Sequence, residues 1–464
     1  MQEMQLQDLK AKKVLIVGLG KTGFSLVNFF NSVHSEVRVT DIKPIFDLNK
    51  EVKKIKKIEP TPELTLGEHK DEDFLDADIV VYSLGVDPKL PQLELARSRG
   101  KKVFSEFSLA YALCPRPIIA VCGTFGRSIT SHMISYALRQ DGKQIFVGGS
   151  SEQPFIDLYL LPNLETLDYV IVEVSAEQAQ SVPNFHPHVV VFTSIGEKYN
   201  ETRFKSHNEY LDTKIKVLNN LDKNDFLIVN FDRLSAHPQL RNAPCQVYWY
   251  SRKSFATMGV MNEIQGTHFH ERRIHSGVHC HSEFKVSKMR ILGPQNRENL
   301  LAAITVCKVL KCSDTAIQKT IEAFPGIPHR LEFVAERNGV YFYNNSKCEV
   351  MKSLGEMLNS VAEPVILIAG GKDTGQDYSP YLEAFRKYVR VLILVGEAKE
   401  NMNRALGDVC PTFLVGSFDE SVLMAYQKSR TGDIVLLAPG NDSTDIFRDY
   451  EERGNYFKKL VFQI

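Results

Sequence analysis

The spacing of apolar positions along the chain predicts strands and helices in alternation. Continuous apolar runs of roughly four to eight residues are typical of strands buried on both faces of a sheet, whereas helices repeat apolar positions every three to four residues. The opening shows both patterns: strands are predicted in KVLIVGLG and EVRVTD, and a helix in KTGFSLVNFFNSV. A later strand is predicted in DADIVVYSLGV. Residues 1–110 are therefore a predicted Rossmann-like domain.

A second group of apolar runs predicts a central α/β domain at residues 111–324. Its strands are expected in PIIAVCG, KQIFVGG, DYVIVEVS, HVVVFTSI and DFLIVNF. Helical stretches separate these runs, which favours a mostly parallel sheet. From residue 245 to 292 the runs become short and polar and predict a small antiparallel flank, after which NRENLLAAITVCKVLK is expected to form a helix.

The segment FPGIPH, residues 324–329, has proline and glycine without periodicity and predicts a hinge. Apolar runs then return in GVYFYNNS, EPVILIAGG, VRVLILVGEA and GDIVLLAPG. Residues 325–464 are therefore a predicted doubly wound Rossmann-like domain. The expected fold class is α/β with three domains. The glycine-containing segment CGTFGRSIT, between a predicted strand and a predicted helix, is the basis for expecting the central one to be a P-loop-type mononucleotide-binding domain.

The balance of charges limits the classes of binding partner, and the cysteine spacing indicates the redox environment of the protein. Lys plus Arg equals Asp plus Glu at 56 each among 464 residues, so no overall field draws the chain to nucleic acid or to an anionic membrane. The N-terminus lacks the apolar core of a signal peptide, and no apolar run approaches the roughly 18 residues of a membrane helix. Eight cysteines occur without a CxxC pair, which favours reduced thiols. We expect a cytoplasmic protein.

The first candidate site is the run from Gly18 to Gly23, between a predicted strand and helix, with Asp41 ending the next strand. Such glycines let a diphosphate approach a helix N-terminus, and the carboxylate can accept from ribose hydroxyls. The pattern fits a nicotinamide cofactor or a UDP-sugar. It also fits glycines that only permit close helix packing.

The second candidate is CGTFGRSIT, residues 122–130, between the strand IIAVCG and a helix. Backbone N–H groups from Gly123 to Ser128 could hold phosphates, and the Ser128 hydroxyl could reach Mg²⁺. A Walker loop would have glycine where Val121 stands and lysine where Arg127 stands. A strand-to-helix turn without nucleotide is the alternative.

Glu173 is a third candidate, because it lies near the carboxyl end of a predicted parallel strand, where a carboxylate can hold Mg²⁺. A helix-capping or solvent-facing acid is the alternative. The fourth candidate is a histidine cluster, namely His268, His270, His275, His279 and His281, with Cys280. We expect ordinary surface histidines here rather than a metal site, since no nearby carboxylate is arranged to support one.

Taken in order, these motifs resemble the Mur ligase family over nearly the whole chain. The matching segments are VGLGKTGFS, SLGV, CGTFGRS, VEVSAEQ, TSIGEKYNE, YLDTKIKVL, LGPQNRENLLAA, PHRLE, NNSKCE, IAGGKDTGQD and LAPGNDSTDIFRDYEERGNYF. The resemblance implies an ATP-dependent, amide-forming ligase of peptidoglycan precursor synthesis that uses Mg²⁺ and acts as a monomer. The motifs are most like those of the member that joins D-glutamate to UDP-N-acetylmuramoyl-L-alanine through an acyl phosphate.

The resemblance also implies roles for individual residues. Arg127, Glu173 and Lys214 would be catalytic. Ser128 and Glu173 would hold Mg²⁺, and the carbamate of a carbamylated Lys214 would help to place a second Mg²⁺. The ATP site would comprise Gly123, Thr124, Phe125, Gly126, Arg127, Ser128, Asn296, Asn299 and Arg330, with His329 in the same hinge segment. The UDP-substrate site would comprise Lys21, Thr22, Asp41 and Ser175, and the amino-acid site Lys347 and Ser443. Viewed alone, Lys214 also fits a solvated helix lysine, and Arg330 a surface ion pair.

Several positions depart from the family pattern. The family usually has asparagine at Phe125 and Ser194, lysine at Arg127 and Thr374, histidine at Tyr199, aspartate at Asn345, threonine at Glu349 and asparagine at Val350. A neutral phenol is a poor magnesium ligand, since its pKa is about 10. The alternative hypothesis is therefore a catalytically impaired paralogue that binds a UDP-sugar or nucleotide. An oxidoreductase explains less, because it leaves two α/β domains without a role.

Overall fold

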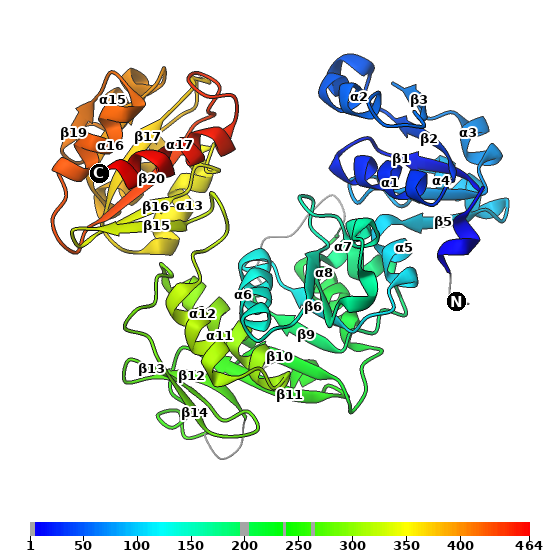
Figure 1. The fold of residues 1–464 in the computed structure, drawn as a ribbon, viewed down its shortest axis with the longest axis horizontal. Coiled ribbons are helices and arrows are strands. Elements are labelled where there is room, and N and C mark those ends of the chain that lie inside the picture. The colour runs from blue at the N-terminus through cyan, green and yellow to red at the C-terminus, as the bar shows by residue number, and fades with distance from the viewer. Residues whose placement is uncertain (1–4, 195–203, 235–237, 261–264) are drawn as a thin grey trace. The chain divides into compact units, whose positions relative to one another are not determined.

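The computed structural model describes residues 5–194, 204–234, 238–260 and 265–464 (Figure 1). The chain divides into two compact units, Met1–Phe284 with Leu301–Ile317, and Lys285–Leu300 with Gln318–Ile464. Two sheets belong to the first unit and a third belongs to the second. The predicted α/β class with three sheet-based domains is confirmed. The domain boundaries at residues 110 and 324 remain a prediction.

The first sheet has five parallel strands in the order β3-β2-β1-β4-β5. Val14 and Ile16 of β1 join the core that includes α1, whereas Leu15 and Val17 join the core that includes α3 and α4. This alternation covers both faces of the sheet with helices. The strands are β1 Lys13–Val17, β2 Glu36–Asp41, β3 Glu63–Leu66, β4 Ile79–Tyr82 and β5 Lys102–Ser105. The helices are α1 Lys21–Ser32, α2 Asn49–Ile55, α3 Asp71–Asp76, α4 Pro91–Ser98 and α5 Glu106–Leu113.

The central sheet has nine strands in the order β14-β13-β12-β11-β10-β9-β6-β8-β7. The strands are β6 Ile118–Cys122, β7 Ile145–Gly148, β8 Tyr169–Val174, β9 Val189–Phe192, β10 Phe226–Asn230, β11 Gln246–Ser251, β12 Gly266–His270, β13 Arg273–Ser276 and β14 Ser282–Lys285. The helices are α6 Arg127–Gln140, α7 Ala176–Ser181, α8 His207–Ile215, α9 Phe231–Leu234, α10 Pro238–Arg241, α11 Pro294–Val309 and α12 Asp314–Ala323.

The predicted antiparallel flank is smaller than the sequence suggested. β11 pairs parallel with β10, and β12 pairs parallel with β11, so the antiparallel pairing begins only at β13. The reason is the connection between β10 and β11, which contains α9 and α10 and is long enough for a crossover. The prediction that the whole of residues 245–292 is antiparallel is wrong for β11.

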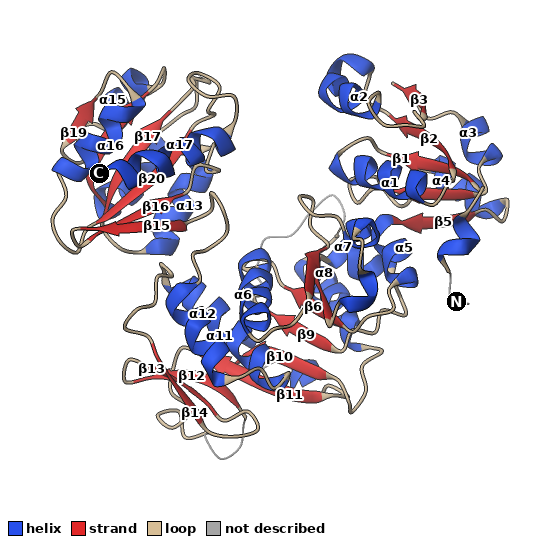
Figure 2. Cartoon of the chain, in the orientation of Figure 1, coloured by secondary structure: helices blue, strands red, loops and turns tan. Residues whose placement is uncertain are grey.

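The third sheet has the order β15-β16-β20-β17-β18-β19 and is parallel except for the antiparallel edge pair β15 and β16. Helices lie on both of its faces (Figure 2). The strands are β15 Glu332–Arg337, β16 Val340–Asn344, β17 Val365–Gly370, β18 Val389–Val395, β19 Thr412–Leu414 and β20 Ile434–Gly440. The helices are α13 Met351–Val361, α14 Leu382–Tyr388, α15 Lys399–Leu406, α16 Phe418–Gln427 and α17 Tyr450–Gln463.

Short elements complete the fold. Within the described parts of the chain, 3₁₀ helices occur at Leu6–Leu9, Ile45–Leu48, Phe155–Leu160, Leu164–Thr166, Lys216–Leu218 and Ser379–Tyr381. All eight cysteines are free thiols, as their scattered spacing predicts. Among the described residues, no helix combines the length and the apolar character needed to cross a membrane.

Candidate active site

The loop from Gly123 to Ser128 connects β6 to the 14-residue helix α6. Gly126 caps the helix in the left-handed conformation, with φ of 85°, and no side chain caps the first turn. The first N–H groups of a helix have no partner within it, and the helix dipole makes this end attractive to anions. The loop therefore presents backbone donors of the kind that bind phosphate.

The loop is held by two residues that follow β9, Thr193 and Ser194. The Thr193 hydroxyl donates to the carbonyl of Phe125 at 2.6 Å, and the Phe125 N–H donates to the Ser194 hydroxyl at 2.9 Å. The Thr124 N–H donates to the carbonyl of Ser194 at 3.0 Å. At Gly123, φ is 145° and an added Cβ would lie 2.1 Å from the Thr193 Oγ1. Ser194, which departs from the family pattern, thus fixes the loop backbone.

Ser128 and Glu173 meet at the carboxyl edge of the central sheet. Glu173 lies on β8, which pairs with β6, so its side chain lies beside the loop that leaves β6. The Ser128 hydroxyl donates to the Glu173 Oε2 at 2.8 Å, and Glu173 is only 6% exposed. A hydroxyl and a carboxylate are hard oxygen ligands that suit Mg²⁺. The predicted proximity of these two residues is present in the fold.

Lys214 is buried on α8, with only 4% of its surface exposed. Its Nζ lies 3.5 Å from the Thr124 Oγ1 and 4.7 Å from the centre of the Tyr210 ring. The Tyr210 hydroxyl lies 3.1 Å from the same Thr124 oxygen. Burial and, as the smaller cause, the nearby Arg127 charge together lower the pKa of Lys214 to about 8. The interpretation of Lys214 as a solvated lysine is therefore wrong.

The two unusual loop residues are placed differently. Arg127 opens α6 and makes no hydrogen bond or ion pair with any residue that the structure describes. Phe125 is 46% exposed, and its hydrogen bonds to Thr193 and Ser194 are made by its backbone. Tyr199, another departure from the family pattern, lies outside the described residues. With no partner among the described residues, the Arg127 guanidinium can bind a ligand on the loop.

The glycine run in the first sheet forms a tight turn at the carboxyl ends of β1 and β2. An added Cβ at Gly23 would lie 2.1 Å from the Gly18 carbonyl oxygen, so helix α1 packs against the turn only with glycine there. Asp41 accepts from the backbone N–H of Leu19 at 2.7 Å and of Lys43 at 2.9 Å. Asp41 thus orders both loops of this edge.

The other predicted UDP-site residues fall in two places. Lys21 is exposed and Thr22 is half-buried in the first turn of α1. Ser175 follows β8 and caps α7 through a capping box, in which its hydroxyl accepts from the Gln178 N–H at 3.2 Å. The Ser175 hydroxyl, two residues after Glu173, is therefore engaged in capping α7.

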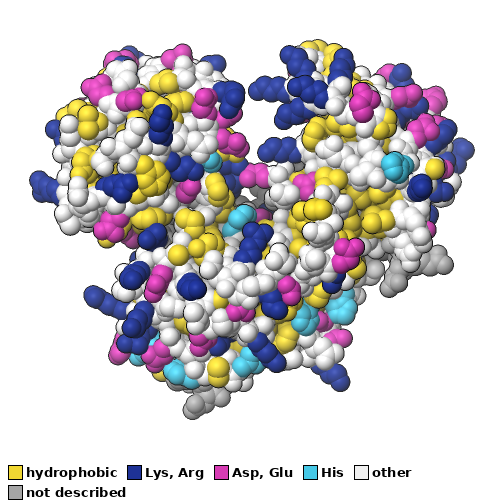
Figure 3. Space-filling view, in the orientation of Figure 1, with side chains coloured by type: hydrophobic (Ala, Val, Ile, Leu, Met, Phe, Trp, Pro, Cys, Tyr) yellow, Lys and Arg dark blue, Asp and Glu magenta, His cyan; other side chains and the backbone are white. Residues whose placement is uncertain are grey.

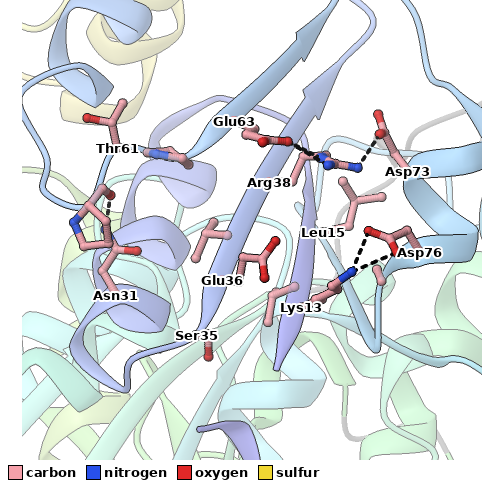
Figure 4. A pocket seen from close by; sticks show the side chains of 15 residues that line it. Lys13, Leu15, Asn31, Ser35, Glu36, Arg38, Thr61, Glu63, Asp73 and Asp76 are labelled. Carbon is pink, nitrogen blue, oxygen red and sulfur yellow. Dashed lines mark hydrogen bonds and ion pairs between the residues drawn. The ribbon is translucent and has the colours of Figure 1, made fainter. Parts of the chain in front are cut away.

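A cavity of about 260 Å³ lies at the opposite edge of the first sheet, where β1 and β2 begin (Figure 4). Arg38 bridges Glu63 at 2.6 Å and Asp73 at 2.8 Å, and Lys13 pairs with Asp76 at 3.0 Å. Most of the charged side chains that line the cavity are therefore paired with one another, and Glu36 lines it as well. Ligands of doubly wound sheets bind at the carboxyl ends of the strands, so this cavity is not the candidate substrate site.

In the second unit, Asn296 and Asn299 occupy the first turns of α11. The Asn296 side chain donates to the carbonyl of Leu292 at 2.9 Å, and the Asn299 side chain donates to Asn296 at 3.3 Å. His329 is buried against Gly454, where an added Cβ would lie 2.1 Å from its Nδ1. Burial lowers the pKa of His329, while the neighbouring Arg330 is exposed.

The predicted amino-acid residues surround Arg453, a residue that sequence reasoning missed. Arg453 is 3% exposed and pairs with Glu349 at 3.4 Å, while the Ser443 hydroxyl donates to the same Glu349 oxygen at 3.3 Å. Burial raises the pKa of Glu349 and lowers that of Arg453 to about 10. Lys347 lies with its Nζ 5.0 Å from the centre of the Tyr450 ring. Glu349 thus accepts from Ser443 and Arg453, while the Arg453 guanidinium also donates to the Ser346 carbonyl at 2.9 Å and to the Asn441 carbonyl at 3.2 Å.

Three other residues that depart from the family pattern, Asn345, Val350 and Thr374, lie in the second unit. Asn345 is buried and accepts from the Leu331 N–H at 3.2 Å, so it supports the hinge segment. Val350 is exposed at the start of α13, and Thr374 is exposed in the loop after β17.

Comparison with known proteins agrees with this geometry. Residues 12–105 match the family description "Mur ligase MurD-like, N-terminal domain", and residues 121–307 match "Mur ligase middle domain". The chain is 37% identical over 461 residues to the UDP-N-acetylmuramoylalanine–D-glutamate ligase of Bdellovibrio bacteriovorus, with 98% of each chain covered. It is 32% identical over 454 residues to the ligase of that name from Geotalea uraniireducens, again covering 98% of each.

Solved structures share the fold. The UDP-N-acetylmuramate–alanine ligase of Thermotoga maritima superposes with a TM-score of 0.54 at 15% identity, covering 97% of this chain and 99% of that one. A UDP-N-acetylmuramoyl-L-alanyl-D-glutamate–2,6-diaminopimelate ligase gives 0.58 at 14% identity, covering 83% and 92%. The fold and the full-length relatives define an enzyme of the amide-bond-forming ligase class. The chain belongs to the Mur ligase family.

Proposed function

We propose that the chain adds D-glutamate to UDP-N-acetylmuramoyl-L-alanine in an ATP-dependent reaction, as a monomeric cytoplasmic enzyme. Relatives that bear the corresponding ligase name cover 98% of the chain at 30–37% identity. The observation that carries the proposal is the cluster beside the loop, where Ser128 contacts Glu173 and Lys214 is buried next to Thr124. An impaired paralogue has no need to keep a buried lysine there.

The residues at this edge fit ATP and Mg²⁺. Backbone N–H groups at the start of α6 and the Arg127 guanidinium are donors for a triphosphate. Ser128 and Glu173 supply oxygen ligands for Mg²⁺, which would neutralise charge on the transferring phosphate. The substrate carboxylate would become an acyl phosphate, and the amino group of D-glutamate would displace phosphate from it. Thr193 and Ser194 keep the loop in one conformation, so its donors need no reorganisation.

Lys214 fits the role of a carbamylated lysine. A carbamate forms when a neutral amine attacks CO₂, and a pKa of about 8 leaves a sizeable neutral fraction near neutral pH. The product would carry a negative charge, which the Arg127 cation favours. The carbamate would convert a buried cation into an oxygen ligand beside the loop.

The amino-acid site is proposed in the second unit around Lys347, Ser443 and Arg453. Lys347 and Arg453 are cations suited to the two carboxylates of D-glutamate. Glu349 adds a negative charge where the family usually has threonine, and it holds the Ser443 hydroxyl. D-glutamate would have to compete with Glu349 for these donors. Asn296, Asn299 and Arg330 are proposed to contact ATP from this unit, and Lys21, Thr22, Asp41 and Ser175 to contact the UDP-substrate.

The experiment that tests the proposal is product analysis by mass spectrometry. Purified protein is incubated with UDP-N-acetylmuramoyl-L-alanine, Mg-ATP and one of D-glutamate, L-glutamate, D-glutamine or D-lysine. We expect a product of the mass increased by one glutamate residue with D-glutamate only. A product with another amino acid would identify that amino acid as the acceptor in place of D-glutamate. Binding of the UDP-substrate without any product would support the hypothesis of an impaired paralogue.

A further inference from the structure

Three strands of the central sheet bring histidines together on one face of the flank. His268 lies directly opposite His275 in the antiparallel pairing of β12 and β13. His270 is two residues further along β12 and therefore points to the same face as His268. The next strand of the sheet, β14, begins just after His281 and contains Glu283. Histidine side chains, cyan in Figure 3, reach the surface over this part of the unit.

Three of these side chains have the spacing of metal ligands. One potential ligand atom from each of His275, His281 and Glu283 lies within 4.8 Å of the others. The Glu283 Oε1 is 3.4 Å from the His281 Nε2 and 3.5 Å from the His275 Nδ1. Ligand atoms of a tetrahedral zinc site are roughly 3.4 Å apart, given bonds of about 2.0–2.1 Å. Small side-chain rotations would therefore close the group around an ion.

Glu283 is also supported from behind. The Arg273 Nη1 donates to the Glu283 Oε2 at 3.0 Å, which leaves Oε1 directed to the histidines. A ligating carboxylate commonly has such an outer partner, which fixes its orientation. The expectation from sequence that no carboxylate supports these histidines is thus wrong, because Glu283 arrives from a different strand.

An independent observation concerns His268, the buried member of the group. His268 is 6% exposed, and its Nδ1 has no hydrogen-bond partner among the described residues. Its ring stacks on that of His275, with 5.6 Å between the ring centres and 15° between the planes. A buried polar nitrogen without a partner destabilises the fold, and ligation by a metal would give it a partner.

We propose that His275, His281 and Glu283 bind a divalent transition-metal ion of the zinc class, with His268 or His270 as the fourth ligand. Imidazole nitrogens and one carboxylate suit Zn²⁺ far better than Mg²⁺, which prefers oxygen. Four protein ligands make a closed, structural site rather than a catalytic one. The ion would join β12, β13 and β14 at the edge of the central sheet.

A second group of possible metal ligands is less suited to bind an ion. His186, Asp222 and Asp225 also offer ligand atoms within 4.8 Å of one another. The Asp225 carboxylate, however, is already bonded to His186 at 2.7 Å and to the Asp222 N–H at 2.9 Å. Its oxygens are satisfied by the fold, so this group serves as a control.

The test measures Zn²⁺ binding by the chelator-treated full-length protein. Isothermal titration is run with Zn²⁺ alone as the probe and with millimolar Mg²⁺ present, so that oxygen sites are filled. We expect one site per chain, together with a rise in Tm, since an ion that binds only the folded state stabilises it. Replacing Zn²⁺ by Co²⁺ should give the visible absorption of a tetrahedral site.

Variants locate the site. His275→Ala/His281→Ala should weaken binding by more than about 100-fold, because changes even in outer partners cost about 10–100-fold. His279→Asn, which lies on the same flank but outside the group, and His186→Ala should bind as the wild type does. Tm without metal checks that each variant is folded. Wild-type protein that binds no Zn²⁺ at about 100 µM, or a double variant that binds it unchanged, overturns the proposal.

Discussion

The Ser128 hydroxyl donates a hydrogen bond to the Glu173 Oε2 at 2.8 Å, although 45 residues separate them in the chain. The pairing of β6 with β8 produces this contact, because Val121 lies opposite Glu173 and the loop turns back over the strand end. Two oxygen ligands are thereby placed at the start of α6, beside the donors for phosphate. This arrangement is the basis of the predictions on catalysis.

Glu173→Gln should remove the anionic metal ligand while keeping the size of the side chain and a hydrogen bond to Ser128. We expect kcat/KM to fall by about 10²–10³-fold, the range seen when a charge-stabilising group is lost. The Mg²⁺ concentration for half-maximal rate should rise. Steady-state kinetics across a Mg²⁺ series measures both, with Glu177→Gln on nearby α7 as the matched control. An unchanged Mg²⁺ dependence would show that Glu173 is not a metal ligand.

Lys214→Ala should lower activity by more than about 100-fold, because the carbamate ligand is lost from a buried position. Short carboxylates such as formate or acetate should restore part of the rate by occupying the space left by the side chain. Rates with and without the added carboxylate measure the rescue. Lys216→Ala, just beyond the end of α8, is the control and should keep full activity. A fully active Lys214→Ala variant contradicts a carbamate role.

The pH dependence of the wild-type enzyme distinguishes a carbamate from a simple lysine cation. At constant dissolved CO₂, the neutral fraction of Lys214 rises as pH approaches about 8, so carbamylation and activity should rise together over that range. If Lys214 acted as a cation, activity would instead fall as pH passes 8. Rescued Lys214→Ala should lack this rise.

Arg127→Lys tests the loop cation. Arg127 makes no hydrogen bond or ion pair among the described residues, so the shorter lysine leaves no protein partner without its bond. We expect ATP affinity to stay within about threefold of the wild-type value or to improve, since a point charge also binds phosphate. Calorimetric titration with an ATP analogue measures it. A loss of affinity beyond tenfold means that the pocket has adapted to the planar guanidinium.

Glu349→Gln should improve the use of D-glutamate. The change keeps the size of the side chain but removes the negative charge that pairs with Arg453 and holds Ser443. We expect KM for D-glutamate to fall by about tenfold, equivalent to about 1.4 kcal/mol, with little change in KM for ATP. Glu400→Gln, on the exposed surface of α15, is the control. A higher KM would mean that Glu349 helps to bind the acceptor.

Much of the fold was predictable because each apolar run is long enough to mark a buried strand. β6, β8 and β20 are almost wholly apolar and lie where the runs predict. The edge strands β15 and β19 were missed, since Glu332–Arg337 has only three apolar residues between charged ones and Thr412–Leu414 is only three residues long. Edge strands need no two-sided apolar run, so the sequence carries a weaker signal for them.

The candidate site was predictable where motif and element coincide. Gly123 and Ser128 sit between a strand and a helix, and Glu173 ends a strand, so their proximity follows from a parallel sheet. The support from Thr193 and Ser194 depends on which strand neighbours β6, and a sequence does not state strand order. The same holds for Glu283 beside His275, which depends on the order of β13 and β14. Arg453 was not singled out from the sequence, because its burial depends on how α17 packs in the fold.

The most direct test of the proposed reaction is the substrate dependence of phosphate release. Purified protein is assayed with Mg-ATP alone, with UDP-N-acetylmuramoyl-L-alanine added, and with D-glutamate added as well. The account predicts sustained phosphate release only when all three substrates are present, and its loss in Glu173→Gln. The account would be contradicted if phosphate release did not depend on D-glutamate. It would also be contradicted if folded protein bound the UDP-substrate but released no phosphate.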